Sequence, residues 1–178
     1  MNIMFVGYSG SGKSTLAKIL SDHYGIPLLH LDTLQFEPNW VIRDPQKRDQ
    51  DVYAFLNDHA SWVIDGNYRS AYFDMRIKKA DQIIILNYNR LTCLKHVIKR
   101  YMTYKNHVRE SIAHGCDEKL DFEFLIWVLF KGRSKVRRKS YKDISIKHFD
   151  KTHVFKNKKA LNHYLSHLGI DDAIPYKR

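Results

Sequence analysis

The sequence predicts an α/β fold in which one parallel sheet is covered by helices on both faces. Short apolar segments alternate with longer segments of helical periodicity along the 178 residues, a pattern typical of chains that form parallel sheets. Between the first apolar run and the first helix, residues 7–15 fit the pattern G-x-x-x-x-G-K-[ST]. The length suits one domain, so we expect residues 1–178 to form a single domain.

Five segments are predicted as strands. The first, residues 3–6, is a short apolar run that ends at Gly7, which is typical of a buried parallel strand. The other strands are expected at residues 27–31, 62–64, 82–86 and 153–155.

Helices are predicted between these strands. Apolar side chains recur at helical spacing in residues 13–24, and Gly25 is a natural C-terminal stop. Asp44 and Pro45 are typical of an N-cap and a first helical position, and they open a helix that reaches about residue 59. Further helices are expected at residues 70–79, 90–104, 121–147 and 157–168.

The formal charge of +11 is concentrated in the second half of the chain. Residues 1–89 carry nine basic and ten acidic side chains, whereas residues 90–178 carry twenty-one and nine. A positive field of this kind suits nucleic acid, an anionic membrane or a phosphorylated small molecule. The basic half includes a polar segment without a clear period, which we interpret as a lid insertion over about residues 101–122.

The composition argues against a secreted or membrane protein. Cys93 and Cys116 form no paired framework, so a disulfide scaffold is not expected. The N-terminus becomes glycine-rich within seven residues, unlike a signal peptide. The longest apolar run, residues 124–130, is far shorter than the ~18 residues that a membrane span needs. We therefore expect a cytoplasmic protein without a membrane partner.

The glycine-rich segment predicts a P-loop, which binds a nucleoside triphosphate together with Mg²⁺. Glycines let the backbone wrap closely around phosphate oxygens, and successive N–H groups at a helix N-terminus form an anion site. Lys13 is expected to reach the β- and γ-phosphates, and the Ser14 hydroxyl to ligate Mg²⁺. The residues expected to bind ATP are Gly7, Ser9, Gly10, Ser11, Gly12, Lys13, Ser14 and Thr15.

The remaining sequence favours phosphoryl transfer to an acceptor. No N-K-x-D motif for guanine is present, and no Asp-Glu pair follows an apolar strand. Asp32 and Asp65 each follow an apolar strand, at the edge where ligands bind in open α/β sheets. A kinase needs one carboxylate to orient the attacking hydroxyl and another to hold Mg²⁺, roles that fit Asp32 and Asp65 respectively. In the alternative interpretation both are turn or N-cap residues.

Several segments resemble known P-loop families. Residues 7–15 resemble the phosphate loop of adenylate kinases, and residues 63–69 (V-I-D-G-N-Y-R) resemble their D-G-F-P-R segment. To about residue 160, the chain more closely resembles the P-loop family of DNA topology modulation proteins (FlaR-like). That resemblance is carried by residues 7–17, 29–32 (L-H-L-D), 38–40 (P-N-W), 64–68 and 115–119 (G-C-D-E-K).

The resemblance implies a nucleoside-monophosphate-kinase-like fold, with three α/β/α layers, a five-stranded parallel sheet of order 2-3-1-4-5, and ATP as donor. By position, Asp65 would be the magnesium-linked carboxylate, and Arg69, which we also count among the residues expected to bind the nucleotide, would face the acceptor. Arg100 falls where adenylate kinases carry a lid arginine. Arg133 and Arg137 fall where those enzymes place phosphate-clamping arginines, and on the predicted helix they share a face.

Two departures from adenylate kinases bear on the acceptor. Residues 31–34 read L-D-T-L where those enzymes have G-D-x-x-R, and the lid lacks their R-x-D-D pair. An Asp directly after the second strand is more like kinases of sugars, shikimate and other hydroxyl compounds. We therefore expect a small hydroxyl-bearing acceptor rather than a nucleoside monophosphate, which remains the alternative.

The sequence as a whole predicts an ATP-dependent phosphotransferase that uses Mg²⁺. The alternative is a nucleotide-dependent regulatory protein that affects DNA topology and has weak or no transferase activity. A DNA contact would lie on the seven basic residues of the segment 131–142, for which no reader motif is present. These residues are Lys131, Arg133, Lys135, Arg137, Arg138, Lys139 and Lys142. The acceptor's identity and the oligomeric state do not follow from the sequence.

Overall fold

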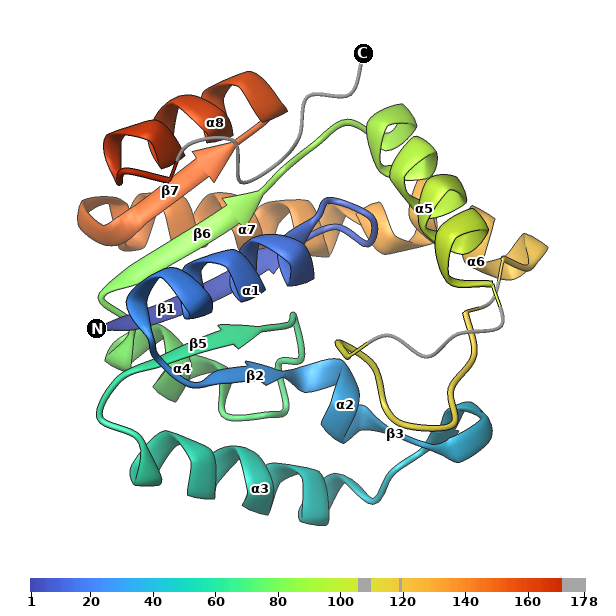
Figure 1. The fold of residues 1–178 in the computed structure, drawn as a ribbon, viewed down its shortest axis with the longest axis horizontal. Coiled ribbons are helices and arrows are strands. Elements are labelled where there is room, and N and C mark those ends of the chain that lie inside the picture. Colours follow the sequence, from blue (N-terminus) through green and yellow to red (C-terminus); the bar gives the residue numbers. More distant parts are fainter. Residues whose placement is uncertain (106–109, 119, 171–178) are drawn as a thin grey trace.

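A central sheet of five parallel strands organises the protein (Figure 1). The computed structural model describes residues 1–105, 110–118 and 120–170. The strands lie in the order β2-β5-β1-β6-β7, which is 2-3-1-4-5 when only the strands of this sheet are counted along the chain. They are β1 (Asn2–Gly7), β2 (Leu28–His30), β5 (Trp62–Asp65), β6 (Gln82–Leu86) and β7 (Thr152–Phe155).

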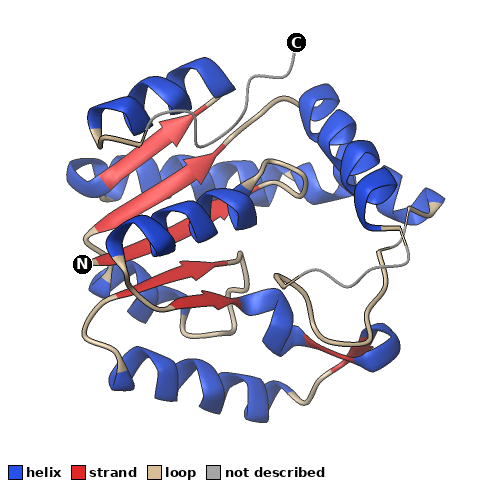
Figure 2. Ribbon diagram, in the orientation of Figure 1, coloured by secondary structure: helices blue, strands red, loops and turns tan. Residues whose placement is uncertain are grey.

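Helices cover both sides of this sheet, as Figure 2 shows, so the expected α/β class is confirmed. In the view of Figure 1, α1 lies in front of the sheet and α7 passes behind it. The helices are α1 (Lys13–Tyr24), α2 (Leu31–Gln35), α3 (Pro45–Asp58), α4 (Phe73–Lys79), α5 (Arg90–Tyr104), α6 (Phe122–Leu129), α7 (Lys135–Lys147) and α8 (Lys158–His167). Single 3₁₀ turns are η1 (Pro38–Trp40), η2 (Lys131–Arg133) and η3 (Phe149–Lys151).

The inner strands are buried on both faces, which explains their continuous apolar runs. Ile3, Met4, Phe5 and Val6 of β1 are fully buried, and so are residues 83–86 of β6. In the described part of the chain, no helix is long and apolar enough to cross a membrane.

The prediction of one helix over residues 121–147 is wrong, because the chain breaks between α6 and α7. Gly132 lies in the η2 turn so close to the preceding helix that a Cβ there would stand 2.7 Å from the carbonyl oxygen of Trp127. The Ser134 hydroxyl then accepts a hydrogen bond from the Arg137 N–H and caps α7. Arg133 and Arg137 therefore do not share one helix.

Two further differences concern the segments around the second strand. β2 ends at His30 and α2 begins at Leu31, so Asp32 lies in the first turn of a helix instead of directly after the strand. A short antiparallel hairpin that the sequence analysis did not predict follows, formed by β3 (Phe36–Glu37) and β4 (Val41–Ile42). Of the expected lid, residues 106–109 and 119 lie outside the described residues.

Arg76 holds the loop that follows β5. It is fully buried in α4, and its guanidinium donates hydrogen bonds to the carbonyl oxygens of Ala71, at 2.9 Å, of Gly66, at 3.1 Å, and of Tyr68. Burial lowers its pKa to about 10, which still leaves the side chain charged at neutral pH. One side chain thus stabilises the whole turn between β5 and α4.

We predict that Arg76→Met lowers the free energy of unfolding by about 3 kcal/mol, because buried carbonyl groups lose their donors. Urea unfolding at pH 7 measures this change. Lys78→Met is the matched control, since Lys78 is exposed on the same helix, and it should change stability by less than about 0.5 kcal/mol. Equal effects of the two substitutions would contradict this role of Arg76.

Candidate functional site

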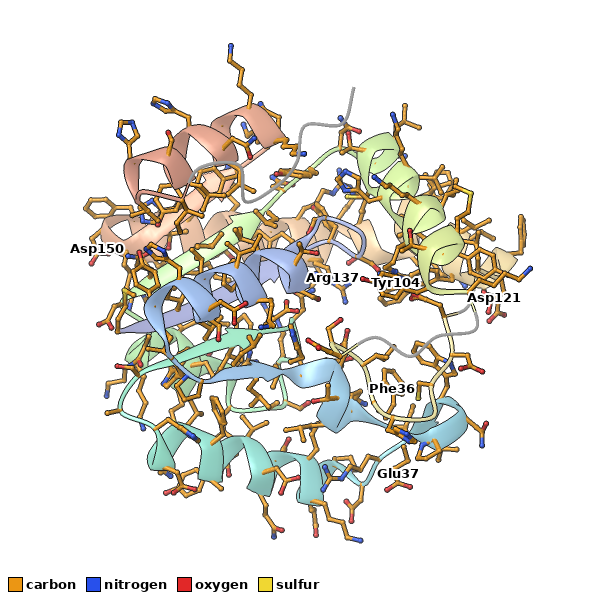
Figure 3. The ribbon with its side chains drawn as sticks, viewed as in Figure 1. Phe36, Glu37, Tyr104, Asp121, Arg137 and Asp150 are labelled. Atoms are coloured by element: carbon orange, nitrogen blue, oxygen red, sulfur yellow. The ribbon has the colours of Figure 1, made fainter. Side chains whose placement is uncertain are left out.

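A cavity of about 850 Å³ opens beside the carboxyl ends of the central strands. Its walls come from the loops after β1 and β5, from α1, α2, the β3–β4 hairpin, α4, α5, α6 and α7, and from Ile112, Glu118 and Asp121 between α5 and α6. In Figure 3, the labelled Phe36, Asp121 and Arg137 lie on different elements around it. Of the predicted site residues, the structure brings eight to its walls: Ser9, Lys13, Ser14, Asp32, Asp65, Arg69, Arg100 and Arg137. The other six predicted site residues do not border the cavity: Gly7, Gly10, Ser11, Gly12, Thr15 and Arg133.

The glycine-rich loop, residues 7–15, comprises the last residue of β1, the connection and the first turn of α1. Gly7, Gly10 and Gly12 all have positive φ values, of 151°, 75° and 90°. A Cβ at Gly7 would stand 2.5 Å from the Leu86 carbonyl oxygen, and one at Gly10 would stand 2.5 Å from that of Cys93. The loop therefore requires glycine for both conformation and space.

Lys13, at the start of α1, lies over this loop. Its Nζ atom donates a hydrogen bond to the Tyr8 carbonyl oxygen, at 3.1 Å. The Lys13 charge is thereby held at the helix N-terminus, where backbone N–H groups also favour an anion. This end of the cavity is suited to a negatively charged group.

Asp65, at the end of β5, is the centre of a buried polar cluster. Its Oδ2 atom accepts a hydrogen bond from the Ser14 hydroxyl, at 2.6 Å, and lies 3.1 Å from His30 Nδ1. Burial opposes ionisation of Asp65, but the His30 contact, the Lys13 charge and the Ser14 hydrogen bond outweigh it, so its pKa lies below the ordinary value. The carboxyl group is therefore ionised at neutral pH.

The same cluster fits the expected Mg²⁺. Asp65 Oδ1 is buried and has no hydrogen-bond partner among the residues that the structure describes. An ionised carboxylate with one unsatisfied oxygen, next to the Ser14 hydroxyl, offers the oxygen ligands that Mg²⁺ prefers. In the described ranges no three His, Cys, Asp or Glu side chains gather into a metal site. Mg²⁺ would thus complete its shell with water and ligand oxygens, as is usual for this ion.

Asp32 faces the cavity from α2 and is oriented by Tyr68. The Tyr68 hydroxyl donates a hydrogen bond to Asp32 Oδ1, at 2.6 Å. Burial and the neighbouring Asp32 charge raise the pKa of Tyr68, so it remains a donor at neutral pH. Although Asp32 lies in a helix, the structure holds its carboxylate in the cavity with Asp65.

The four predicted arginines have different surroundings. Arg100 in α5 forms an ion pair with the buried Glu118, with Nε to Oε2 at 2.9 Å. Arg69 donates a hydrogen bond to Ser140, and Arg137 lies over the Trp127 ring with its guanidinium carbon 5.1 Å from the centroid. All three line the cavity.

Arg133 does not border the cavity and packs against the glycine-rich loop. Its guanidinium carbon lies 3.9 Å from the centroid of the Tyr8 ring, and its nitrogens donate to the carbonyl oxygens of Val128 and Tyr88. This corrects the expectation that Arg133 shares a face with Arg137.

The seven basic residues of the segment 131–142 differ in their exposure to solvent. Five of them are exposed: Lys131, Lys135, Arg138, Lys139 and Lys142. Direct DNA binding stays a prediction that these five would carry.

The sequence analysis missed Asn67, which joins the β5–α4 loop to the glycine-rich loop. Its Oδ1 atom accepts from the Gly7 N–H, at 3.0 Å, and its Nδ2 atom donates to the Gly7 carbonyl oxygen, at 2.7 Å. The Tyr141 hydroxyl also contacts Oδ1, at 3.3 Å. The signal in the sequence was the position of Asn67, two residues after Asp65. His30, Tyr68 and Glu118 were also missed as site residues, because their partners are distant in the chain.

We predict that Asn67→Asp destabilises the protein, because a carboxylate cannot donate to the Gly7 carbonyl oxygen. The loss should be about 1–3 kcal/mol at pH 7. The new carboxyl group faces an acceptor, so its folded-state pKa is raised above its unfolded value of about 3.9. The destabilisation should therefore grow as pH rises above about 4 and become smaller at pH 4.5 than at pH 7. Denaturant unfolding of variant and wild type at both pH values measures it.

Asn89→Asp is the matched control for this experiment. Asn89 caps α5 by accepting a hydrogen bond from the Thr92 N–H, at 2.8 Å, and a carboxylate performs this task equally well. This variant should show almost no loss at either pH. A pH-independent loss in Asn67→Asp would contradict the donor role of the Asn67 amide.

Comparisons with known proteins identify no family for this chain. No protein-family model and no curated protein matches it. A crystal structure of an uncharacterized protein from Eubacterium ventriosum matches with a TM-score of 0.47 and 16% sequence identity, over 95% of this chain and 98% of that chain. Likeness at this level carries no argument about function, which therefore rests on the cavity itself.

Proposed function

We propose that the protein is a P-loop kinase that transfers the γ-phosphoryl group of ATP to the hydroxyl group of a small acceptor. The observation that carries this proposal is that Lys13 and Ser14, at the N-terminus of α1, share one cavity with two carboxylates, Asp65 and Asp32. Phosphoryl transfer requires an anion site for the phosphates, an ionised carboxylate for Mg²⁺ and a second carboxylate for the acceptor. We also propose that the chain belongs to the family of DNA topology modulation proteins, which its sequence resembles.

At the donor end, the glycine-rich loop and Lys13 bind the β- and γ-phosphates of ATP. Ser14 and Asp65 hold Mg²⁺, which when bound neutralises charge on the phosphate oxygens. His30 keeps the Asp65 carboxylate in place through its contact with Oδ2. Arg137 and Arg69 line the cavity. Their positive charges stabilise the negative charge on the phosphate oxygens during transfer.

At the acceptor end, Asp32 orients the attacking hydroxyl group, while Tyr68 fixes the position of the carboxylate. The acceptor oxygen forms a bond to the γ-phosphorus, and the bond from that phosphorus to the β–γ bridging oxygen breaks. The electron pair of the broken bond leaves with ADP, and the hydroxyl proton passes to Asp32. Arg100, which pairs with Glu118, also lines the cavity. It lies on α5, the helix that leads into the expected lid.

We predict that Lys13→Ala lowers the turnover of ATP by about 10²–10³-fold, because the transition state loses a positioned charge. Turnover is measured with γ-labelled ATP and a metabolite extract, and ATP affinity by calorimetry. The matched control is Lys18→Ala, since Lys18 is exposed on the same helix, does not line the cavity and forms an ion pair with Asp22 at 2.6 Å. Unchanged turnover in Lys13→Ala would refute the mechanism at the donor end.

Asp32→Asn should separate transfer from nucleotide binding. We expect kcat to fall by about 10²–10⁴-fold, as for loss of an acid–base group, while ATP affinity stays at the wild-type value. A loss of ATP affinity with normal turnover of bound ATP would make Asp32 a structural residue. If the wild type binds ATP but no labelled product forms from the extract, the protein is a nucleotide-dependent regulator instead of a kinase.

A further inference from the structure

Two exposed histidines face each other on α8, outside the cavity. His163 and His167 stand one turn apart in this helix, which lies beside the edge strand β7 (Figure 1). Among the described residues that line the cavity, none belongs to α8. The pair therefore takes no part in the proposed phosphoryl transfer.

The imidazole nitrogens of this pair converge on one point. The two Nε2 atoms lie 3.2 Å apart, whereas the ring centroids are 4.5 Å apart, so both nitrogens are on the facing sides of the rings. Two nitrogens bound to one tetrahedral metal ion, each at about 2.0–2.1 Å, stand about 3.3 Å from each other. The spacing of the two nitrogens thus already matches that of a metal chelate.

The folded helix fixes this spacing. Residues four apart lie on the same face of a helix, one turn from each other. α8 is anchored by Leu161 and Leu165, each only 1% exposed, and its N-terminus is capped by Asn157, which accepts from the Ala160 N–H at 2.9 Å. In the unfolded chain nothing holds the two imidazole rings together.

Both imidazole rings are available to a ligand. Within the described part of the chain, the side chains of His163 and His167 have no hydrogen bond or ion pair other than the contact between their Nε2 atoms. That contact requires one nitrogen to carry a proton and the other to accept it. A metal ion takes the place of the shared proton, which passes to solvent, and both lone pairs then bind the ion.

The chemistry of the two ligands selects the class of ion. Imidazole nitrogen suits Zn²⁺, Cu²⁺ and Ni²⁺, whereas Mg²⁺ and Ca²⁺ prefer oxygen. His167 also lies in the last turn of α8, where the carbonyl groups at the end of the helix favour a cation. Over the described ranges no third His, Cys, Asp or Glu side chain joins the pair. Water would therefore complete the coordination of the ion.

The pair lacks the base that a hydrolytic zinc site needs. In the motif H-E-x-x-H, with the same spacing, the Glu after the first His acts as general base. Here that position is Tyr164, whose hydroxyl donates to Gln82 Oε1 at 2.8 Å and whose ring packs against Phe155, with centroids 5.1 Å apart. The arrangement therefore favours a metal ion that stabilises structure over one that performs catalysis.

We propose that His163 and His167 bind one divalent transition-metal ion of the Zn²⁺ class, and that the bound ion stabilises α8. The ion joins two side chains that only the folded helix brings together, so it binds the folded chain more tightly than the unfolded one. This site is separate from the Mg²⁺ expected at Asp65 and does not depend on the proposed kinase function.

Calorimetric titration of Zn²⁺ into the full chain, without an affinity tag and in excess Mg²⁺, tests the site. His163→Gln and His167→Gln should each lower the affinity for Zn²⁺ at least about tenfold, because a chelate loses one of its two ligands. His23→Gln is the matched control, since His23 is exposed in the last turn of α1 and has no histidine four residues away. It should leave the affinity unchanged.

Urea unfolding with and without saturating Zn²⁺ tests the effect on stability. The ion should raise the unfolding midpoint of the wild type and of His23→Gln, and a chelator should reverse this shift. It should not raise the midpoint of His163→Gln or His167→Gln. Circular dichroism without metal checks that each variant is folded.

Equal affinity of the wild type and the two α8 variants for Zn²⁺ would overturn the inference. An equal loss of affinity in His23→Gln would also overturn it, because surface histidines in general would then hold the ion. The stabilising role fails if Zn²⁺ binds at the pair and the unfolding midpoint of the wild type does not change.

Discussion

Parallel pairing of β1 with β5 and β6 is the constraint on which the candidate site depends. In this register Phe5 pairs with Asp65 and Gly7 pairs with Leu86, so the loops after all three strands leave the sheet at one edge. Asn67 lies where the next partner of Gly7 on β5 would fall, and its side-chain amide makes the two hydrogen bonds that a strand would make. The glycine-rich loop is thus joined to the loop that begins at Asp65, and the two meet at the Ser14 hydroxyl.

The distribution of charge follows from how each cation is paired. The second half of the chain carries the positive excess, yet Arg133 is stacked on Tyr8 and Arg100 is balanced by Glu118. Charged groups that leave water need partners, because desolvation is costly. The net charge therefore overstates the positive field inside the cavity, because much of it lies on exposed side chains, among them Lys131, Lys135, Arg138, Lys139 and Lys142.

Much of the fold could be predicted from local sequence. The buried strands appear as apolar runs, α1 follows from its periodicity and from Gly25, and α3 from Asp44 and Pro45, because these signals act within one element. The break between α6 and α7 was missed although Gly132 and Ser134 indicate it, since the apolar and basic runs on either side also suit one helix. The β3–β4 hairpin escaped prediction because two-residue strands have no period, and it is stabilised by contacts with Gly115 and Cys116.

The sequence by itself determined the parallel α/β sheet, the position of the glycine-rich loop and the candidate residues Lys13, Ser14, Asp32 and Asp65, because each depends on spacing within a short segment. Tertiary structure decided which of the other candidates reach the cavity. Arg137 does and Arg133 does not, although they stand four residues apart, and Asn67, Tyr68 and Glu118 gain their roles only from partners that are 18 or more residues away. Hydrogen bonds and ion pairs between distant segments leave no local pattern in the sequence, so only the folded chain specifies them.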